Sequence, residues 1–131
     1  MLIDTSGFLC LYEKGEPYHE RAVVFYDSAS RRLTTNYVLT EYTALAQVRG
    51  ILRSEIIKFS KRILDDEEIE IVWVDENLHR QAVELIEQRE DKTYSLCDAV
   101  SLILMRQRGI SEALTTDKHF EQEGFTRLLK S

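Results

Sequence analysis

Short apolar segments alternate with longer segments of helical spacing along this chain of 131 residues, and the alternation limits the folds open to it. The segments expected to be strands are residues 1–4, 33–36, 69–74, 113–116 and 125–129. Parallel neighbouring strands need a crossover of about a dozen residues or more, which a helix usually supplies. We therefore predict an α/β fold in which a parallel sheet is covered by helices on both faces.

Single residues mark the expected ends of the helices. Pro17 fits the first turn of a helix, and Gly50 is placed to close one. Asp75 and Ser95 are of the types that cap helix N-termini. The predicted helices are residues 6–13, 17–31, 37–49, 51–66, 76–89 and 96–109.

Composition predicts one compact domain over residues 1–131, because 44% of the residues are hydrophobic and only one is proline. No segment reaches the ~20 apolar residues of a membrane span, and no basic segment followed by a long apolar stretch opens the chain. A cytoplasmic protein is expected. Cys10 and Cys97 form no C-x-x-C pair, so we expect two buried, reduced thiols. The formal charge of -6 argues against a protein that coats nucleic acid through bulk electrostatics.

Four acidic residues stand where an apolar strand or helix would otherwise continue. Asp4 and Asp117 follow predicted strands, whereas Glu41 and Asp98 interrupt the apolar faces of predicted helices. Buried carboxylates are costly unless a positive charge neutralises them, and oxygen ligands suit a hard divalent cation. The pattern therefore predicts a metal-dependent phosphodiesterase.

Each of these acids also has an alternative structural role. The alternatives are a helix cap for Asp4, a turn cap for Asp117, an ion pair with Arg49 for Glu41, and an ion pair with Arg106 or Lys92 for Asp98. All four together, two at strand ends and two in helix faces, favour a shared metal site.

Several short motifs, in order, resemble the PIN-domain nucleases across essentially the whole chain. They are L-I-D-T-S at 2–6, T-T-N at 34–36 followed by the lone Glu41, Y-S-L-C-D-A at 94–99, L-T-T-D-K-H-F at 114–120 and G-F at 124–125. The size resembles VapC-type toxins and their stand-alone relatives. The resemblance implies a three-layer α/β/α sandwich, a Mg²⁺- or Mn²⁺-dependent endoribonuclease that hydrolyses RNA, a cognate antitoxin in a type II pair, and commonly a homodimer.

The resemblance also assigns roles to residues of this chain. The acidic ligands fall on Asp4, Glu41, Asp98 and Asp117, and the supporting positions fall on Thr5 or Ser6, Asn36 and Thr116. Cys97 departs from the hydroxyl residue that many relatives carry before the third acid, so the hydrogen bonding around Asp98 stays open. Ser95 is interpreted as a helix cap, and Asp91 as a solvated loop residue or an outer carboxylate.

Metal-dependent hydrolysis needs no side-chain nucleophile, because a bound cation activates water and stabilises phosphoryl charge. We expect Asp4 and Asp98 to hold the principal ion, with Asp117 and Glu41 completing the site directly or through water; one or two ions fit this set. The histidines lack the spacing of a zinc helix, and His119, near Asp117, is expected to be a solvated turn residue.

The most basic stretch of the chain runs from position 49 to position 62. It contains Arg49, Arg53, Lys58, Lys61 and Arg62, opposed only by Glu55. RNA contact and a solvated helix face are equally favoured, and an antitoxin groove is a further alternative.

Two other functions remain open. One is a non-catalytic PIN module that binds RNA or a protein partner. The other is a phosphatase acting on small phosphoesters, which the sequence disfavours because Ser6 stands at the second position of the usual D-x-D pair.

Overall fold

A central parallel sheet of five strands organises the computed structural model, which describes residues 1–131. The strands are β1 (Leu2–Ile3), β2 (Leu33–Thr35), β3 (Glu70–Val72), β4 (Glu112–Leu114) and β5 (Thr126–Arg127). Their order in the sheet is β3-β2-β1-β4-β5, with every neighbouring pair parallel. The predicted α/β class with a parallel sheet is confirmed.

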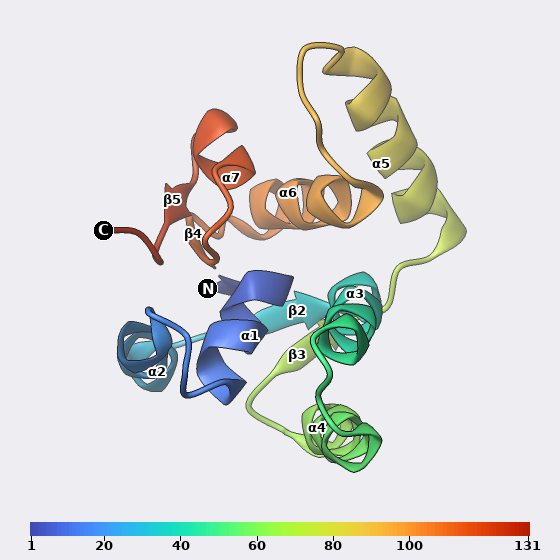
Figure 1. Cartoon of the computed structure of the whole chain (residues 1–131). Helices are drawn as coiled ribbons and strands as arrows, with labels where there is room; N and C mark the ends of the chain where they lie inside the picture. Colours follow the sequence, from blue (N-terminus) through green and yellow to red (C-terminus); the bar gives the residue numbers. More distant parts are fainter.

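Seven helices flank the sheet in two layers (Figure 1). They are α1 (Thr5–Tyr12), α2 (His19–Ser28), α3 (Asn36–Val48), α4 (Arg53–Asp65), α5 (Glu76–Gln88), α6 (Leu96–Arg108) and α7 (His119–Gln122). Helices α5, α6 and α7 pack on one face, and α1 to α4 pack on the other. Successive side chains of β1 point to opposite faces of the sheet, so this strand contributes to the core on both faces. Leu2 lies in the first core cluster and Ile3 in the second. The expected three-layer sandwich is confirmed.

The central strand β1 brings two distant parts of the chain together. Ile3 pairs in register with Leu114 of β4, and the backbone N–H of Asp4 donates to the Leu114 carbonyl at 3.2 Å. Helix α1, which follows β1, packs close against β4. A Cβ added at Gly7 of this helix would lie only 2.1 Å from the Leu114 carbonyl oxygen. The residues that follow β1 and β4 therefore share one edge of the sheet.

Most helix ends follow the sequence signals. The Asp75 carboxylate accepts the Leu78 N–H at 2.8 Å at the start of α5, and Gly109 ends α6 with a φ of 64°. Pro17 is an exception, because it lies in a turn and α2 begins only at His19. Two successive turns precede α2, and they are closed by hydrogen bonds from the Glu16 and His19 N–H groups. The helix therefore begins about half a turn later than predicted.

Both cysteines are buried and unpaired, as expected. None of the helices combines the length and the apolar character required to cross a membrane.

Candidate metal centre

The carboxyl ends of β1 and β4 place Asp4 and Asp117 on opposite sides of one buried hydroxyl. Thr115 donates to Oδ2 of Asp4 at 2.9 Å, and its Oγ1 accepts the backbone N–H of Asp117 at 3.0 Å. The fully buried Thr115 hydroxyl also lies 3.1 Å from the Ser6 hydroxyl. Thr115 therefore fixes the relative position of two acids from opposite ends of the chain.

The sequence prediction named Thr116 for this supporting role, and the structure favours its neighbour. Thr116 contributes only backbone groups, its N–H donating to Ser6 Oγ at 2.9 Å and its carbonyl accepting from Arg127. A signal for Thr115 was available, because residues 115 and 117 are two apart in extended chain just past a strand and so point to the same side.

Asp4 is the most deeply buried of the four acids. The residue is 4% exposed, and Oδ1 has no hydrogen-bond partner. Although Asp4 occupies the N-cap position of α1, its side chain makes no capping hydrogen bond, so the alternative role as a helix cap is not observed. Burial, and next the nearby carboxylate of Asp98, raise the pKa of Asp4 to about 7.

Asp98 combines a structural role with a place among the four acids. These acids, Asp4, Glu41, Asp98 and Asp117, are called the acidic group below. Its Oδ2 accepts the Ser95 N–H at 3.0 Å, while Ser95 Oγ accepts the Asp98 N–H at 3.0 Å, which forms a capping box at the start of α6. The alternative ion pairs are absent, because Arg106 pairs with Glu123 and Lys92 with Asp91.

Glu41 was expected within a buried apolar helix face, and this expectation is wrong. The buried line of α3 runs through Val38, Tyr42 and Ala46, and Glu41 lies beside that line with its side chain exposed. Oε1 of Glu41 accepts the Thr5 hydroxyl at 2.5 Å, whereas Arg49 pairs with Glu16. Glu41 thus approaches the other three acids from the solvent side.

His119 is a part of the site that the sequence prediction missed. Its Nδ1 lies 3.0 Å from Asp98 Oδ2 and 3.3 Å from Asp117 Oδ2, so it is not the solvated turn residue expected. Thr93 Oγ1 lies 3.1 Å from Nε2, and the Tyr94 ring packs edge-on at 5.0 Å. The position two residues after Asp117 was the only sequence signal. Asp117 Oδ1 also accepts the His119 backbone N–H at 2.9 Å, so the alternative role of Asp117 as a turn cap is observed as well.

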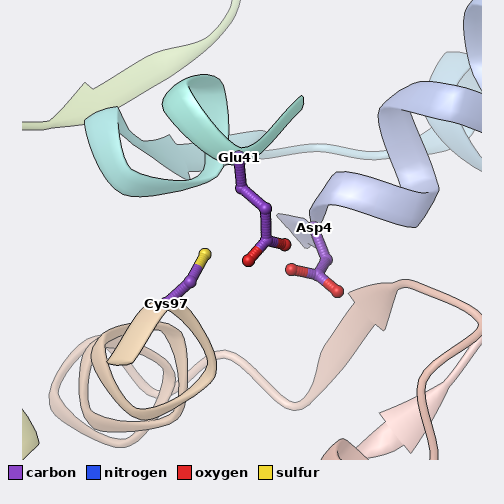
Figure 2. A group of neighbouring side chains, drawn as sticks. All are labelled: Asp4, Glu41 and Cys97. Carbon is purple, nitrogen blue, oxygen red and sulfur yellow. The ribbon is translucent and has the colours of Figure 1, made fainter. Parts of the chain in front are cut away.

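The candidate ligands form two groups that meet at Asp4 and Asp98. One group is Asp4, Glu41 and Cys97, and the other is Asp98, Asp117 and His119; within each group the candidate ligand atoms lie within 4.8 Å of one another. The three side chains of the first group point toward one another from the end of β1, from α3 and from the start of α6 (Figure 2).

The unpartnered Oδ1 of Asp4, amid further carboxylates, fits a bound divalent cation. A hard cation satisfies such an oxygen and lowers the cost of placing several carboxylates together. The donor set is therefore chemically suited to the expected metal, while the number and the identity of the ions stay predictions.

The remaining predicted residues lie outside this acidic group. The side-chain Oδ1 of Asn36 accepts the Val74 N–H at 2.7 Å and so ties α3 to the segment after β3. Lys58 lies 3.7 Å from Glu55, and the Arg62 guanidinium lies 5.7 Å from the centre of the Tyr12 ring. Helix α4, which carries most of the basic stretch, packs against α3 on the side away from α6 (Figure 1).

Three comparisons agree on the relationship of this chain to known proteins. The PIN domain family model matches residues 1–125. The 23S rRNA-specific endonuclease VapC20, from two strains of Mycobacterium tuberculosis, is 30% identical over 129 residues, which cover 98% of this chain and 97% of VapC20. The crystal structure of M. tuberculosis VapC20, described as a sarcin–ricin loop cleaving toxin, matches with a TM-score of 0.86 and 28% identity over 98% of each chain.

Proposed function

The chain belongs to the PIN domain family, and on that premise we propose that it is a metal-dependent endoribonuclease and the toxin of a type II toxin–antitoxin pair. One observation carries the catalytic part. Asp4 is buried with an unpartnered oxygen beside Asp98 at the edge where β1 and β4 end, and in open α/β sheets that edge is where ligands bind.

We assign the principal Mg²⁺ or Mn²⁺ ligands to Asp4 and Asp98, with Asp117 and Glu41 completing the site directly or through water. A bound cation supplies an activated water and stabilises negative charge on the phosphoryl oxygens. Thr115 holds Asp4 in place, and His119 holds Asp98 and Asp117. Glu41 is the exposed acid, so it is best placed to orient water entering from solvent.

The substrate class follows from the relatives. VapC20 is named for 23S rRNA and for cleavage of the sarcin–ricin loop, so we propose a structured ribosomal RNA loop as the first substrate to test. An antitoxin encoded beside this protein, a homodimeric assembly and a cytoplasmic site of action belong to the same proposal.

The deciding experiment is cleavage of 23S rRNA and of a mixed structured RNA pool by the purified protein with Mg²⁺ or Mn²⁺. An EDTA control and the Asp98→Asn variant accompany it. Asparagine keeps an oxygen where Asp98 accepts from Ser95 and from His119, so the fold is expected to persist while a charged ligand is lost.

We expect metal-dependent cutting by the parent protein and at least a hundredfold loss in the variant. Equal cleavage by the variant, or cleavage that survives EDTA, would contradict the assignment. RNA binding without any cutting by the parent protein would favour the non-catalytic alternative.

A further inference from the structure

A sulfur atom lies among the oxygen donors of the site. The Cys97 Sγ, one carboxylate oxygen of Asp4 and one of Glu41 lie within 4.8 Å of one another. The Cys97 side chain points from the first turn of α6 toward the Glu41 carboxylate, which lies between Cys97 and Asp4 (Figure 2). Three donors gathered this closely are a candidate set of ligands for one metal ion.

The group also contains an atom that lacks a partner. Oδ1 of Asp4 accepts no hydrogen bond although the residue is only 4% exposed, so the ionised carboxylate is uncompensated there unless a cation binds. Cys97 is itself buried at 7% exposure, whereas Glu41 is exposed, so the group extends from the interior to the surface. A cation held by these three residues would satisfy Oδ1 of Asp4.

We propose that Asp4, Glu41 and Cys97 form a site for a thiophilic divalent cation, of which Zn²⁺ is the physiological candidate. Zn²⁺ takes tetrahedral sets of sulfur, nitrogen and carboxylate ligands, and three protein ligands leave the fourth position to water. Mg²⁺ discriminates against sulfur, whereas softer ions select it. As the S–Zn bond forms, the thiol S–H bond breaks and its proton passes to solvent, with no change of oxidation state.

Zn²⁺ bound in this way would compete with the catalytic cation, because it takes Asp4 and Glu41 away from the acidic group. We expect Zn²⁺ to inhibit RNA cleavage even with Mg²⁺ in excess. This consequence rests on the proposed nuclease function, whereas the binding site itself does not. The two parts are therefore tested by separate measurements.

Cobalt(II) tests the binding site directly, because a Co–thiolate bond gives a sulfur-to-metal charge-transfer band in the near ultraviolet. The parent protein, with its thiols kept reduced by a phosphine, is titrated with Co²⁺ and then with Zn²⁺. We expect the band to appear and Zn²⁺ to bleach it. Cys97→Ser should abolish the band, whereas the matched control Cys10→Ser should keep it, since Cys10 lies near the end of α1 and outside the acidic group.

Inhibition is then measured as the Zn²⁺ concentration that halves cleavage in Mg²⁺, each variant being compared with its own uninhibited rate. Cys97→Ser should require at least about tenfold more Zn²⁺ than the parent protein, since loss of even an outer partner costs a metal site tenfold or more. Cys10→Ser should match the parent protein.

A band that persists in Cys97→Ser, or no band in the parent protein, would overturn the proposed site whether or not the protein cuts RNA. Equal Zn²⁺ sensitivity of the parent protein and Cys97→Ser would overturn the competition. Failure of the parent protein to cut RNA, with the cobalt band intact, would instead count against the proposed function alone.

Discussion

Asp4 sets the charge balance of the acidic group. Burial, and next Asp98, raise its pKa to about 7 from an ordinary value of 3.8. Between these values the folded, metal-free protein holds a proton that the unfolded chain has released. Folding stability therefore falls as the pH rises through this window. Each pKa unit corresponds to about 1.4 kcal/mol, so the effect is at most about 4 kcal/mol.

The Asp4→Asn variant tests this pH dependence. In chelator we expect the free energy of unfolding of the parent protein to fall from pH 5 to pH 8, and we expect the variant to be more stable at pH 8 with a flatter profile. Asparagine keeps an oxygen that can accept from Thr115. Urea unfolding at each pH measures the difference, and added Mn²⁺ should restore only the parent protein at pH 8. Parallel pH profiles would show that Asp4 is ionised in both states.

His119 is expected to orient the acids rather than to bind the cation. Its Nδ1 faces Asp98 and Asp117, and its other nitrogen is held by Thr93. Asparagine places an N–H group near the Nδ1 position, whereas glutamine places one near Nε2. Calorimetry should therefore show that His119→Asn binds Mn²⁺ nearly as tightly as the parent protein, and that His119→Gln and His119→Ala lose about tenfold or more. If asparagine fails like alanine, the imidazole is itself a ligand.

Helix α6 carries the acid whose position depends most on local structure. Asp98 is the third residue of the helix, and the reciprocal bonds with Ser95 fix both the helix start and the carboxylate. Within this capping box, Ser95 Oγ accepts the Asp98 N–H and caps the helix, while the Ser95 N–H donates to the Asp98 carboxylate and orients it. Damage to this cap should therefore affect metal binding as well as stability.

The comparison of two caps separates these effects. Ser95→Ala and Asp75→Ala each remove one N-cap side chain, and each should cost about 1 kcal/mol in the free energy of unfolding. Ser95→Ala keeps the backbone N–H that donates to the Asp98 carboxylate, so it should weaken Mn²⁺ affinity only through the loosened helix start. Asp75→Ala should leave Mn²⁺ affinity unchanged, because Asp75 caps α5. Denaturant unfolding and Mn²⁺ titration of both variants check this. Equal Mn²⁺ affinities in the two variants would mean that the cap does not orient Asp98.

Helix α6 also shows which features the sequence could reveal. Its start at Ser95, its end at Gly109 and the burial of Asp98 follow from cap residues and from a nearly continuous apolar run. Glu41 was misjudged because its apolar neighbours on α3 were taken as core, and Val48 is in fact 86% exposed. Spacing identifies apolar residues, but only tertiary packing decides which of them are covered.

Contacts between segments far apart in the sequence could not be predicted from local sequence patterns, for a second reason. His119 meets Asp98 across 21 positions, and Thr115 meets Asp4 across 111. Strand order brings these residues together, and no periodicity within a single element encodes that order. The burial of Asp4 and Asp98 was nevertheless predictable from the sequence, because a carboxylate next to an apolar strand or in an apolar helix is a local feature.

Across the molecule, helix α4, which carries Arg53, Lys58, Lys61 and Arg62, lies on one side of α3, and helix α6, which carries Asp98, lies on the other (Figure 1). The formal charge of -6 repels a phosphate backbone, so RNA affinity depends on where the cations are exposed. Lys58 and Arg62 are exposed on α4, and RNA that reaches both α4 and the acidic group must pass over α3. The basic stretch therefore predicts an extended contact rather than a contact with the scissile phosphate.

Charge reversal at Lys58 and Arg62 tests that contact, in an Asp98→Asn background so that binding is measured without cleavage. If both residues contact phosphates, Lys58→Glu with Arg62→Glu should weaken RNA binding and reduce the slope of log K against log salt by roughly 1.5 to 2. The matched control reverses Arg80 and Arg108, which pair with Glu76 and Glu70 away from α4. A control that weakens binding equally would assign the effect to net charge. An unchanged slope in the α4 variant would leave α4 as a solvated or antitoxin-facing helix.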